Sequence, residues 1–327
     1  MNAEPGEVVE RSVSDIDGRN ESSVDPNHPA ANAAHVDGKR ALSVAVLQMH
    51  CEDDRDANVE RAEKLVRNAA ERDAQVVLLP ELFESLYFCR TENPAHFDLA
   101  HPFEGNPLIA RFAALAAELG VVLPLSFFER AGQAHFNSLA MIDADGRVLG
   151  RYRKSHIPDG PGYEEKYYFS PGDTGFRVWK TRFATIGVGI CWDQWFPECA
   201  RALALGGAEL LLYPTAIGSE PHEPGYDSQP HWETVMRGHA AANLVPVAAA
   251  NRIGQEAELA FYGSSFIAGA TGEVLVRAPR DAEAIETATV DLEEIARRRR
   301  SWGLFRDRRP DLYGALGTLD GALVPQA

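Results

Sequence analysis

Segments typical of strands and of helices alternate along this chain from Ala41 onward, and this alternation restricts the fold more than any other feature. Short apolar runs at residues 76–79 and 121–127 are typical of buried strands. Between such runs lie segments whose apolar residues have helical spacing, among them residues 58–72 and the segment that begins at Pro107. Strands and helices in alternation predict an α/β protein built in layers.

Three pairs of strand-like runs are separated by turns short enough for hairpins. They are residues 138–142 with 147–152, 176–180 with 183–190, and 264–268 with 273–278. Asp145-Gly146 joins the first pair, and an aspartate–glycine turn is typical of a tight hairpin. Further helix and strand patterns follow at residues 197–205, 209–213, 232–243 and 245–250. Hairpins combined with alternating helices and strands predict mixed sheets.

The two ends of the chain differ from its middle. Residues 1–40 are polar and acidic with almost no apolar clustering, so we expect a disordered tail there. Residues 41–327 contain no low-complexity linker, and a single catalytic domain is the simpler prediction. Residues 302–313 mix aromatic and charged side chains, which favours an interface arm. The four arginines at 297–300 lie near acidic residues, which favours a solvated helix face or a subunit contact over a nucleic-acid patch.

Composition narrows the possible partners and the compartment. The formal net charge is −16, which argues against nucleic acid or an anionic membrane as a partner and suits a small cationic substrate. Solubility alone would also explain that charge. Four cysteines without a CxxC pair, and histidines without a ligand spacing, predict neither disulfides nor a metal site. So few cysteines in a chain of this length suit a reducing cytoplasm, which is the compartment we expect. No apolar run is long enough to cross a membrane.

Three chemical groups follow strand-like runs and together suggest a thiol acyl-transfer site. Cys191 follows the run at residues 183–190, and Pro197 then suits the first turn of a helix. Glu81 and Lys154 each follow another run. A thiol nucleophile needs a base, which a shielded carboxylate supplies, and a lysine can stabilise an oxyanion. The plainer alternatives are a buried structural cysteine, a glutamate at a helix start and a solvated lysine.

Three short segments carry a resemblance to a known family. Residues 78–83 (LLPELF), 152–158 (YRKSHIP) and 189–193 (GICWD) resemble the signature regions of the nitrilase, or carbon–nitrogen hydrolase, superfamily. The resemblance implies a four-layer α-β-β-α sandwich with mixed sheets. It also implies assembly as a homo-oligomer and a reaction that needs neither a metal nor an organic cofactor.

The same resemblance implies roles for four residues. Glu81 would be the general base, Lys154 the oxyanion stabiliser and Cys191 the nucleophile, while Glu165 would position Lys154 or assist proton transfer. Its neighbour Glu164 is expected at the surface, although the sequence alone leaves a swap of the two roles open.

Longer sequence segments resemble one particular group within this superfamily. Residues 154–163, 191–198, 213–221 and 301–313 resemble the N-carbamoylputrescine amidohydrolases within the superfamily, and the similarity runs from about residue 42 to 322. It implies the splitting of N-carbamoylputrescine by water into putrescine, ammonia and carbon dioxide. The stretch between Arg252 and Phe261 is shorter than the loop usual in that group, which leaves the preferred substrate length open.

The substrate implied by this resemblance ends in an alkyl ammonium, which needs a carboxylate partner when buried. Glu220 is the first choice for that partner, with Asp227 and Asp193 behind it. Trp192 and Trp195 are candidates for the walls around the alkyl chain, although aromatic residues beside a catalytic group are as often core.

Other functions stay open at this level. The same chemistry could act on a carbamoyl amino acid or on β-ureidopropionate, which would require a cation for the carboxylate end. A non-catalytic binding protein and an oxidation sensor based on Cys191 are weaker alternatives. His156 is expected to order its loop through a hydrogen bond rather than to transfer protons.

Overall fold

Strand β2 (Lys39–His50) organises the first of two large sheets in the computed structural model, which describes residues 35–36 and 39–322. It pairs antiparallel with β15 (Ala284–Asp291) and parallel with β3 (Val76–Leu78). The amide of Val77 donates to the carbonyl of Val122, which joins β3 to a meander. The meander consists of β4 (Leu123–Ala131), β5 (Ala134–Ile142) and β6 (Val148–Arg153).

The second sheet has the strand order β14-β13-β10-β9-β8-β7. Its strands are β7 (Val178–Lys180), β8 (Thr185–Val188), β9 (Leu210–Pro214), β10 (Val247–Ala250), β13 (Phe266–Ala268) and β14 (Val274–Arg277). Strands β8, β9 and β10 run parallel, while the hairpins β7–β8 and β13–β14 are antiparallel. The predicted mixed sheets and the three predicted hairpins are therefore present.

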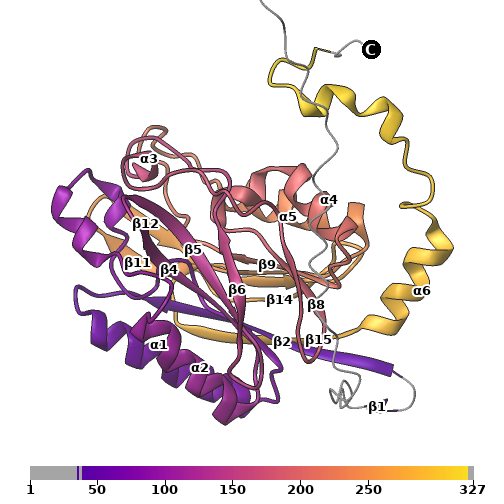
Figure 1. Cartoon of the computed structure of the whole chain (residues 1–327), viewed down its shortest axis with the longest axis horizontal. Coiled ribbons are helices and arrows are strands. Elements are labelled where there is room, and N and C mark those ends of the chain that lie inside the picture. Colours follow the sequence, from indigo (N-terminus) through magenta and orange to yellow (C-terminus); the bar gives the residue numbers. More distant parts are fainter. Residues whose placement is uncertain (1–34, 37–38, 323–327) are drawn as a thin grey trace, which may run out of the picture. The chain divides into compact units, whose positions relative to one another are not determined.

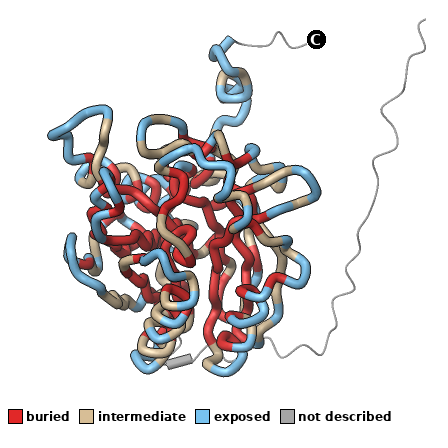
Figure 2. The backbone as a smooth tube through the Cα atoms, turned by 90° about the vertical axis from the view of Figure 1, so that its left-hand side faces the viewer, coloured by how far each residue is buried: buried red, intermediate tan, exposed pale blue. Residues whose placement is uncertain are grey.

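Two pairs of helices cover the outer faces of the sheets (Figure 1). Helices α1 (Arg55–Ala70) and α2 (Pro107–Leu119) share an apolar cluster with the first sheet. Helices α4 (Pro197–Leu205) and α5 (Gln229–Asn243) share another with the second sheet. A third cluster fills the space between the sheets. Figure 2 shows that the buried residues gather in the interior, while the exposed residues lie at the periphery. The predicted four-layer α-β-β-α sandwich is confirmed.

The remaining elements are further strands of the first sheet together with short helices and helical turns. They are β1 (His35–Val36), η1 (Phe88–Arg90), η2 (Pro94–Leu99), α3 (Glu165–Tyr168), η3 (Cys191–Trp195), β11 (Arg252–Glu256), β12 (Leu259–Tyr262), α6 (Leu292–Trp302), η4 (Pro310–Leu312) and η5 (Gly314–Gly317). The stretch expected to be a shortened loop after Arg252 is a tight hairpin, and β11 begins beside the end of β2. On α6, Arg298 pairs with Glu294, and Arg299 donates to the carbonyls of Leu244 and Ala208.

Most of the predicted acidic tail, residues 1–34 and 37–38, lies outside the described residues. Strand β1 and the first two residues of β2 fall within its predicted limits. Among residues 35–36 and 39–322, no helix is both long and apolar enough to cross a bilayer.

Candidate active site

Three of the predicted site residues lie just after strands, and a fourth, Glu165, begins the short helix α3. Glu81 comes shortly after β3, Lys154 directly after β6, and Cys191 begins the turn η3 after β8. The ammonium Nζ of Lys154 donates to Glu81 Oε1 at 2.8 Å and to Glu165 Oε2 at 2.6 Å. All four residues are exposed by 5% or less. Strands β3 and β6 together with helix α3 therefore bring one cation and two carboxylates to the region of the thiol.

The backbone at Cys191 adopts a conformation that is rare for a residue with a side chain. Its φ is +41°, in the left-handed region, and such residues persist only where the surroundings enforce them. Gly189 lies tightly behind this turn, since a Cβ there would approach Tyr213 to 2.8 Å. The Cys191 thiol donates to the carbonyl of Ala216 at 3.8 Å. The turn is thus held in one strained shape that presents the sulfur to the cavity.

Asp193 braces this turn and does not line the cavity, contrary to its predicted role in substrate binding. It is fully buried, and Oδ2 accepts from the Ile190 amide at 2.9 Å and the Tyr152 hydroxyl at 2.8 Å. Its Oδ1 accepts from the His156 amide and bonds to the ring Nδ1 of His156. Both oxygens are committed to the protein. His156, which also stacks on Phe196 with ring centroids 3.6 Å apart, orders the loop after Lys154 as predicted.

The two glutamates differ in which oxygens are occupied. Glu81 Oε1 accepts from Lys154 and from Asn137 Nδ2 at 2.6 Å, whereas Oε2 is buried and has no hydrogen-bond partner among the described residues. Both oxygens of Glu165 are used, because Oε1 accepts from the Tyr87 hydroxyl at 2.7 Å and Oε2 from Lys154. Glu81 therefore has the oxygen that is free to take a proton.

Burial dominates the electrostatics of the cluster. It raises the pKa of the Cys191 thiol well above its usual value, and the charge of Glu81 raises it further while Lys154 opposes both. Burial disfavours the Lys154 ammonium, but Glu165 and Glu81 outweigh this and hold the pKa of Lys154 well above its ordinary range. The resting site thus contains a neutral thiol and a charged ammonium, so the thiol needs a base.

Glu165 makes the stability of the fold depend on pH. Burial, reinforced by the charge of Glu81, raises the pKa of Glu165 from 4.5 to about 7 despite the opposing Lys154. Because the folded state holds this proton more tightly than the unfolded chain, its stabilising contribution is complete below about pH 4.5 and is lost as the pH rises through about 7.

We expect the unfolding free energy of the wild type to fall by up to about 3 kcal/mol more than that of Glu165→Gln between about pH 5 and about pH 8. Urea unfolding of both proteins at several pH values in this window measures the difference. Identical pH slopes for the two proteins would contradict the assignment.

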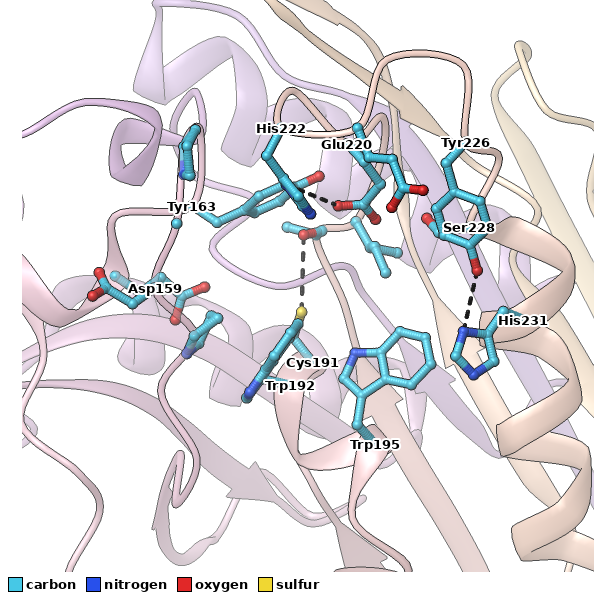
Figure 3. A pocket seen from close by; sticks show the side chains of 17 residues that line it. Asp159, Tyr163, Cys191, Trp192, Trp195, Glu220, His222, Tyr226, Ser228 and His231 are labelled. Atoms are coloured by element: carbon cyan, nitrogen blue, oxygen red, sulfur yellow. Dashed lines mark hydrogen bonds and ion pairs between the residues drawn. The ribbon is translucent and has the colours of Figure 1, made fainter.

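A cavity of about 300 Å³ opens beside the Cys191 sulfur. Figure 3 shows Trp192 and Trp195 near the sulfur and Glu220 on the opposite wall, so these three predicted residues do line it. Glu220 is largely buried, with 17% of its side chain exposed, and lies 4.0 Å from His222 Nδ1. The acidic residues that line the cavity are Asp159, Glu165, Glu220 and Glu223, and no arginine or lysine stands among the described lining residues.

Asp227, the second choice for the ammonium partner, does not line the cavity. Both of its oxygens accept from the exposed Arg280, at 2.8 and 3.0 Å. Among residues 35–36 and 39–322, no group of three or more His, Cys, Asp and Glu side chains is arranged to hold a metal ion.

Sequence reasoning missed two partners of the glutamates, Asn137 and Tyr87. Asn137 lies inside strand β5 and Tyr87 in the loop before η1, and both are fully buried. Nothing in the local sequence marks Tyr87. For Asn137 the one available signal is a polar residue within a predominantly buried strand.

Comparison with known proteins agrees with this geometry. The Carbon-nitrogen hydrolase family model matches residues 43–300. The chain belongs to the carbon-nitrogen hydrolase family. An N-carbamoylputrescine amidase of Solanum lycopersicum is 58% identical over 291 residues, which cover 86% of this chain and 97% of that protein. A citrullinase of Francisella tularensis is 54% identical over 276 residues, 83% of this chain and 96% of the relative.

The solved structures include a carbon-nitrogen hydrolase from Helicobacter pylori with 42% sequence identity and a TM-score of 0.81. The match covers 85% of this chain and 99% of that one. As a carbon–nitrogen hydrolase of this fold, the chain carries Glu81, Lys154, Glu165 and Cys191 in one buried cluster.

Proposed function

We propose that this carbon–nitrogen hydrolase converts N-carbamoylputrescine and water into putrescine, ammonia and carbon dioxide through a carbamoyl-enzyme at Cys191. One observation carries the chemistry: Lys154 is held between two carboxylates, and only Glu81 keeps an unoccupied buried oxygen near the thiol. The similarity to N-carbamoylputrescine amidases and the acidic wall of the cavity support the substrate.

Acylation begins with proton transfer from the Cys191 thiol to Glu81 Oε2. The sulfur attacks the ureido carbon, and the carbonyl electron pair moves to oxygen. An ammonium has three N–H donors, and Lys154 uses two on the glutamates, so one remains for the oxyanion beside the Trp192 amide in the first turn of η3. When the carbonyl re-forms, the carbon–nitrogen bond breaks and the departing nitrogen takes the proton from Glu81.

Deacylation repeats these steps with water. Glu81 takes a proton from the water while the water oxygen attacks the carbamoyl carbon bound to sulfur. The carbon–sulfur bond then breaks, and the Cys191 sulfur takes that proton from Glu81. The carbamic acid product then loses carbon dioxide. Because the same base and oxyanion donors serve both halves, the cluster accounts for the whole reaction.

Glu220 and the aromatic walls suit the other end of the substrate. An alkyl ammonium at Glu220 forms a charge-assisted pair in a largely buried position, where leaving either charge unpaired is costly. Trp192, Trp195 and Tyr163 provide apolar surface along the path from Cys191 to that carboxylate.

Citrulline is the second candidate because of the 54% identity to a citrullinase. Its α-carboxylate requires a positive partner that an amine substrate does not. The only side chains among the described lining residues that could become cationic are His222 and His231. His231 already bonds to the Tyr226 hydroxyl at 3.3 Å, and His222 faces Glu220. The lining therefore favours the amine.

Ammonia release from N-carbamoylputrescine, citrulline and N-carbamoyl-β-alanine tests this choice, with wild type and Glu220→Gln. We expect the wild type to prefer N-carbamoylputrescine. Loss of one charge-assisted contact in Glu220→Gln should lower kcat/KM for it by about 10- to 100-fold and leave N-carbamoyl-β-alanine nearly unchanged. Asp227→Asn, a carboxylate outside the cavity, is the matched control. Equal loss on all three compounds would contradict the assignment of Glu220.

We also propose that the protein acts in the cytoplasm as a homo-oligomer. Its four cysteines are unpaired, as a reducing compartment requires. The end of α6 and the segment after it expose the large apolar side chains of Trp302, Leu312 and Leu316, which suits a subunit interface. Sedimentation of the full chain tests this, and a single-chain species at micromolar concentration would contradict it.

A further inference from the structure

Arg252 is a fully buried cation behind the proposed catalytic base. It begins strand β11 and has no exposed side-chain surface. Its Nη2 donates to the carbonyls of Glu81 and Leu82, both at 2.9 Å. Its Nη1 donates to the Ser85 carbonyl at 3.3 Å and to Glu256 Oε1 at 2.9 Å. The planar guanidinium of Arg252 thus donates hydrogen bonds to three backbone carbonyls of the loop that carries Glu81.

The loop that carries Glu81 has a disfavoured backbone conformation, which these hydrogen bonds from Arg252 stabilise. Leu82, directly after Glu81, has a φ of +48°, which is disfavoured for a residue with a branched side chain. Its amide donates to Ser126 Oγ at 3.0 Å, while its carbonyl is held by Arg252. Without the guanidinium, the peptide that sets the direction of the Glu81 side chain would be free to return to an ordinary conformation.

The ion pair of Arg252 with Glu256 extends to the second glutamate of the cluster. Glu256 Oε2 accepts from the amide of Tyr87 at 2.6 Å, and the Tyr87 hydroxyl donates to Glu165. The rings of Tyr87 and Phe261 flank the guanidinium at 5.7 and 5.3 Å. Both carboxylates that hold Lys154 are therefore connected to the same buried arginine–glutamate pair.

We propose that Arg252, paired with Glu256, is a positioning residue for proton transfer. It fixes the backbone of Glu81 and, through Glu256 and Tyr87, the carboxylate of Glu165. Lysine cannot replace it, because a single ammonium does not span carbonyls and a carboxylate in a planar fork. The inference rests on the proposed role of Glu81 as the base, but not on the identity of the ureido substrate.

A double-mutant cycle between Arg252→Lys and Glu81→Gln tests the proposal. The readout is the burst of nitrophenolate from p-nitrophenyl acetate as it acylates Cys191, corrected with Cys191→Ala. Acylation by this activated ester uses the thiol, is accelerated by the base and requires no site for an ammonium group. Because the leaving group is good, the reaction keeps a measurable rate when the base is removed. The test therefore remains valid even if N-carbamoylputrescine is not turned over, an outcome that would overturn only the proposed function.

We expect Arg252→Lys to slow the burst by at least about tenfold in the wild-type background and by less than about twofold in the Glu81→Gln background. The KM for the ester should change little. Arg277→Lys, which weakens an arginine–glutamate pair to Glu233 at the edge strand β14, is the matched control and should retain the wild-type rate.

Equal losses in both backgrounds would show a general structural effect and overturn the proposal, as would a folded Arg252→Lys variant with the wild-type burst rate. If Arg252→Lys does not fold, Glu256→Gln takes its place in the cycle. Glu256→Gln preserves size, removes the charge of the ion pair and leaves one acceptor in place of two. The same dependence on Glu81 is expected, with a loss of about three- to tenfold.

Discussion

Replacement of Glu81 by glutamine is expected to lower kcat by about 10²- to 10⁴-fold while the protein remains folded. The amide keeps the size of the side chain and one acceptor for Lys154 and Asn137, but it cannot take a proton from Cys191. Burial has raised the pKa of that thiol, so spontaneous ionisation does not substitute for the base.

Steady-state ammonia release together with thermal unfolding measures this effect. Glu84→Gln is the matched control: it is the same substitution three residues further on, at a buried carboxylate that accepts from Arg55 and does not contact the cluster. The control should keep its activity within about twofold. A Glu81→Gln enzyme with near wild-type kcat would rule out Glu81 as the base.

Replacement of Lys154 by methionine is expected to have the largest effect on stability. The Lys154 ammonium is the cation between Glu81 and Glu165, and all three side chains are fully buried. Removing one partner from a buried ionic group costs about 3–5 kcal/mol, because the remaining charges stay uncompensated. The two carboxylates would then favour a shared proton, so the loss should be greater at alkaline than at acidic pH.

Urea unfolding of Lys154→Met at two pH values tests this expectation, and adding Glu165→Gln separates charge from packing. Removal of one carboxylate charge should restore most of the lost stability, yet activity should remain at least about 10²-fold below wild type because the oxyanion donor is gone. If Lys154→Met alone were as stable as the wild type, this would contradict the description of the cluster as one cation balancing two carboxylates.

The fold could be predicted because its signals are local. Apolar runs and turn residues mark most strands and the four outer helices, and helix α4 was predicted with both ends correct. Strand β15 escapes prediction because its sequence, AIETATVD, has no apolar run and most of its residues are only partly buried. Its place beside β2 depends on pairing with residues more than 200 positions earlier.

The sequence indicates the positions of three site residues along the chain but not the residues that they contact. Glu81, Lys154 and Cys191 each follow a strand signal, so their positions could be found along the chain. Their partners could not: Asn137 reaches Glu81 from 56 residues away, and Tyr87 reaches Glu165 from 78. Asp193 was misplaced because sequence proximity to Cys191 does not tell on which side of the turn its carboxylate lies.

The proposed reaction requires a covalent carbamoyl intermediate on Cys191 during the hydrolysis of N-carbamoylputrescine. The most direct measurement is mass spectrometry of the peptide that contains Cys191 after acid quenching during turnover, with ammonia release recorded for wild type and Cys191→Ala. We expect one added acyl group on Cys191 in the wild type and no turnover in the variant. Ammonia release by Cys191→Ala at a rate near that of the wild type would contradict it.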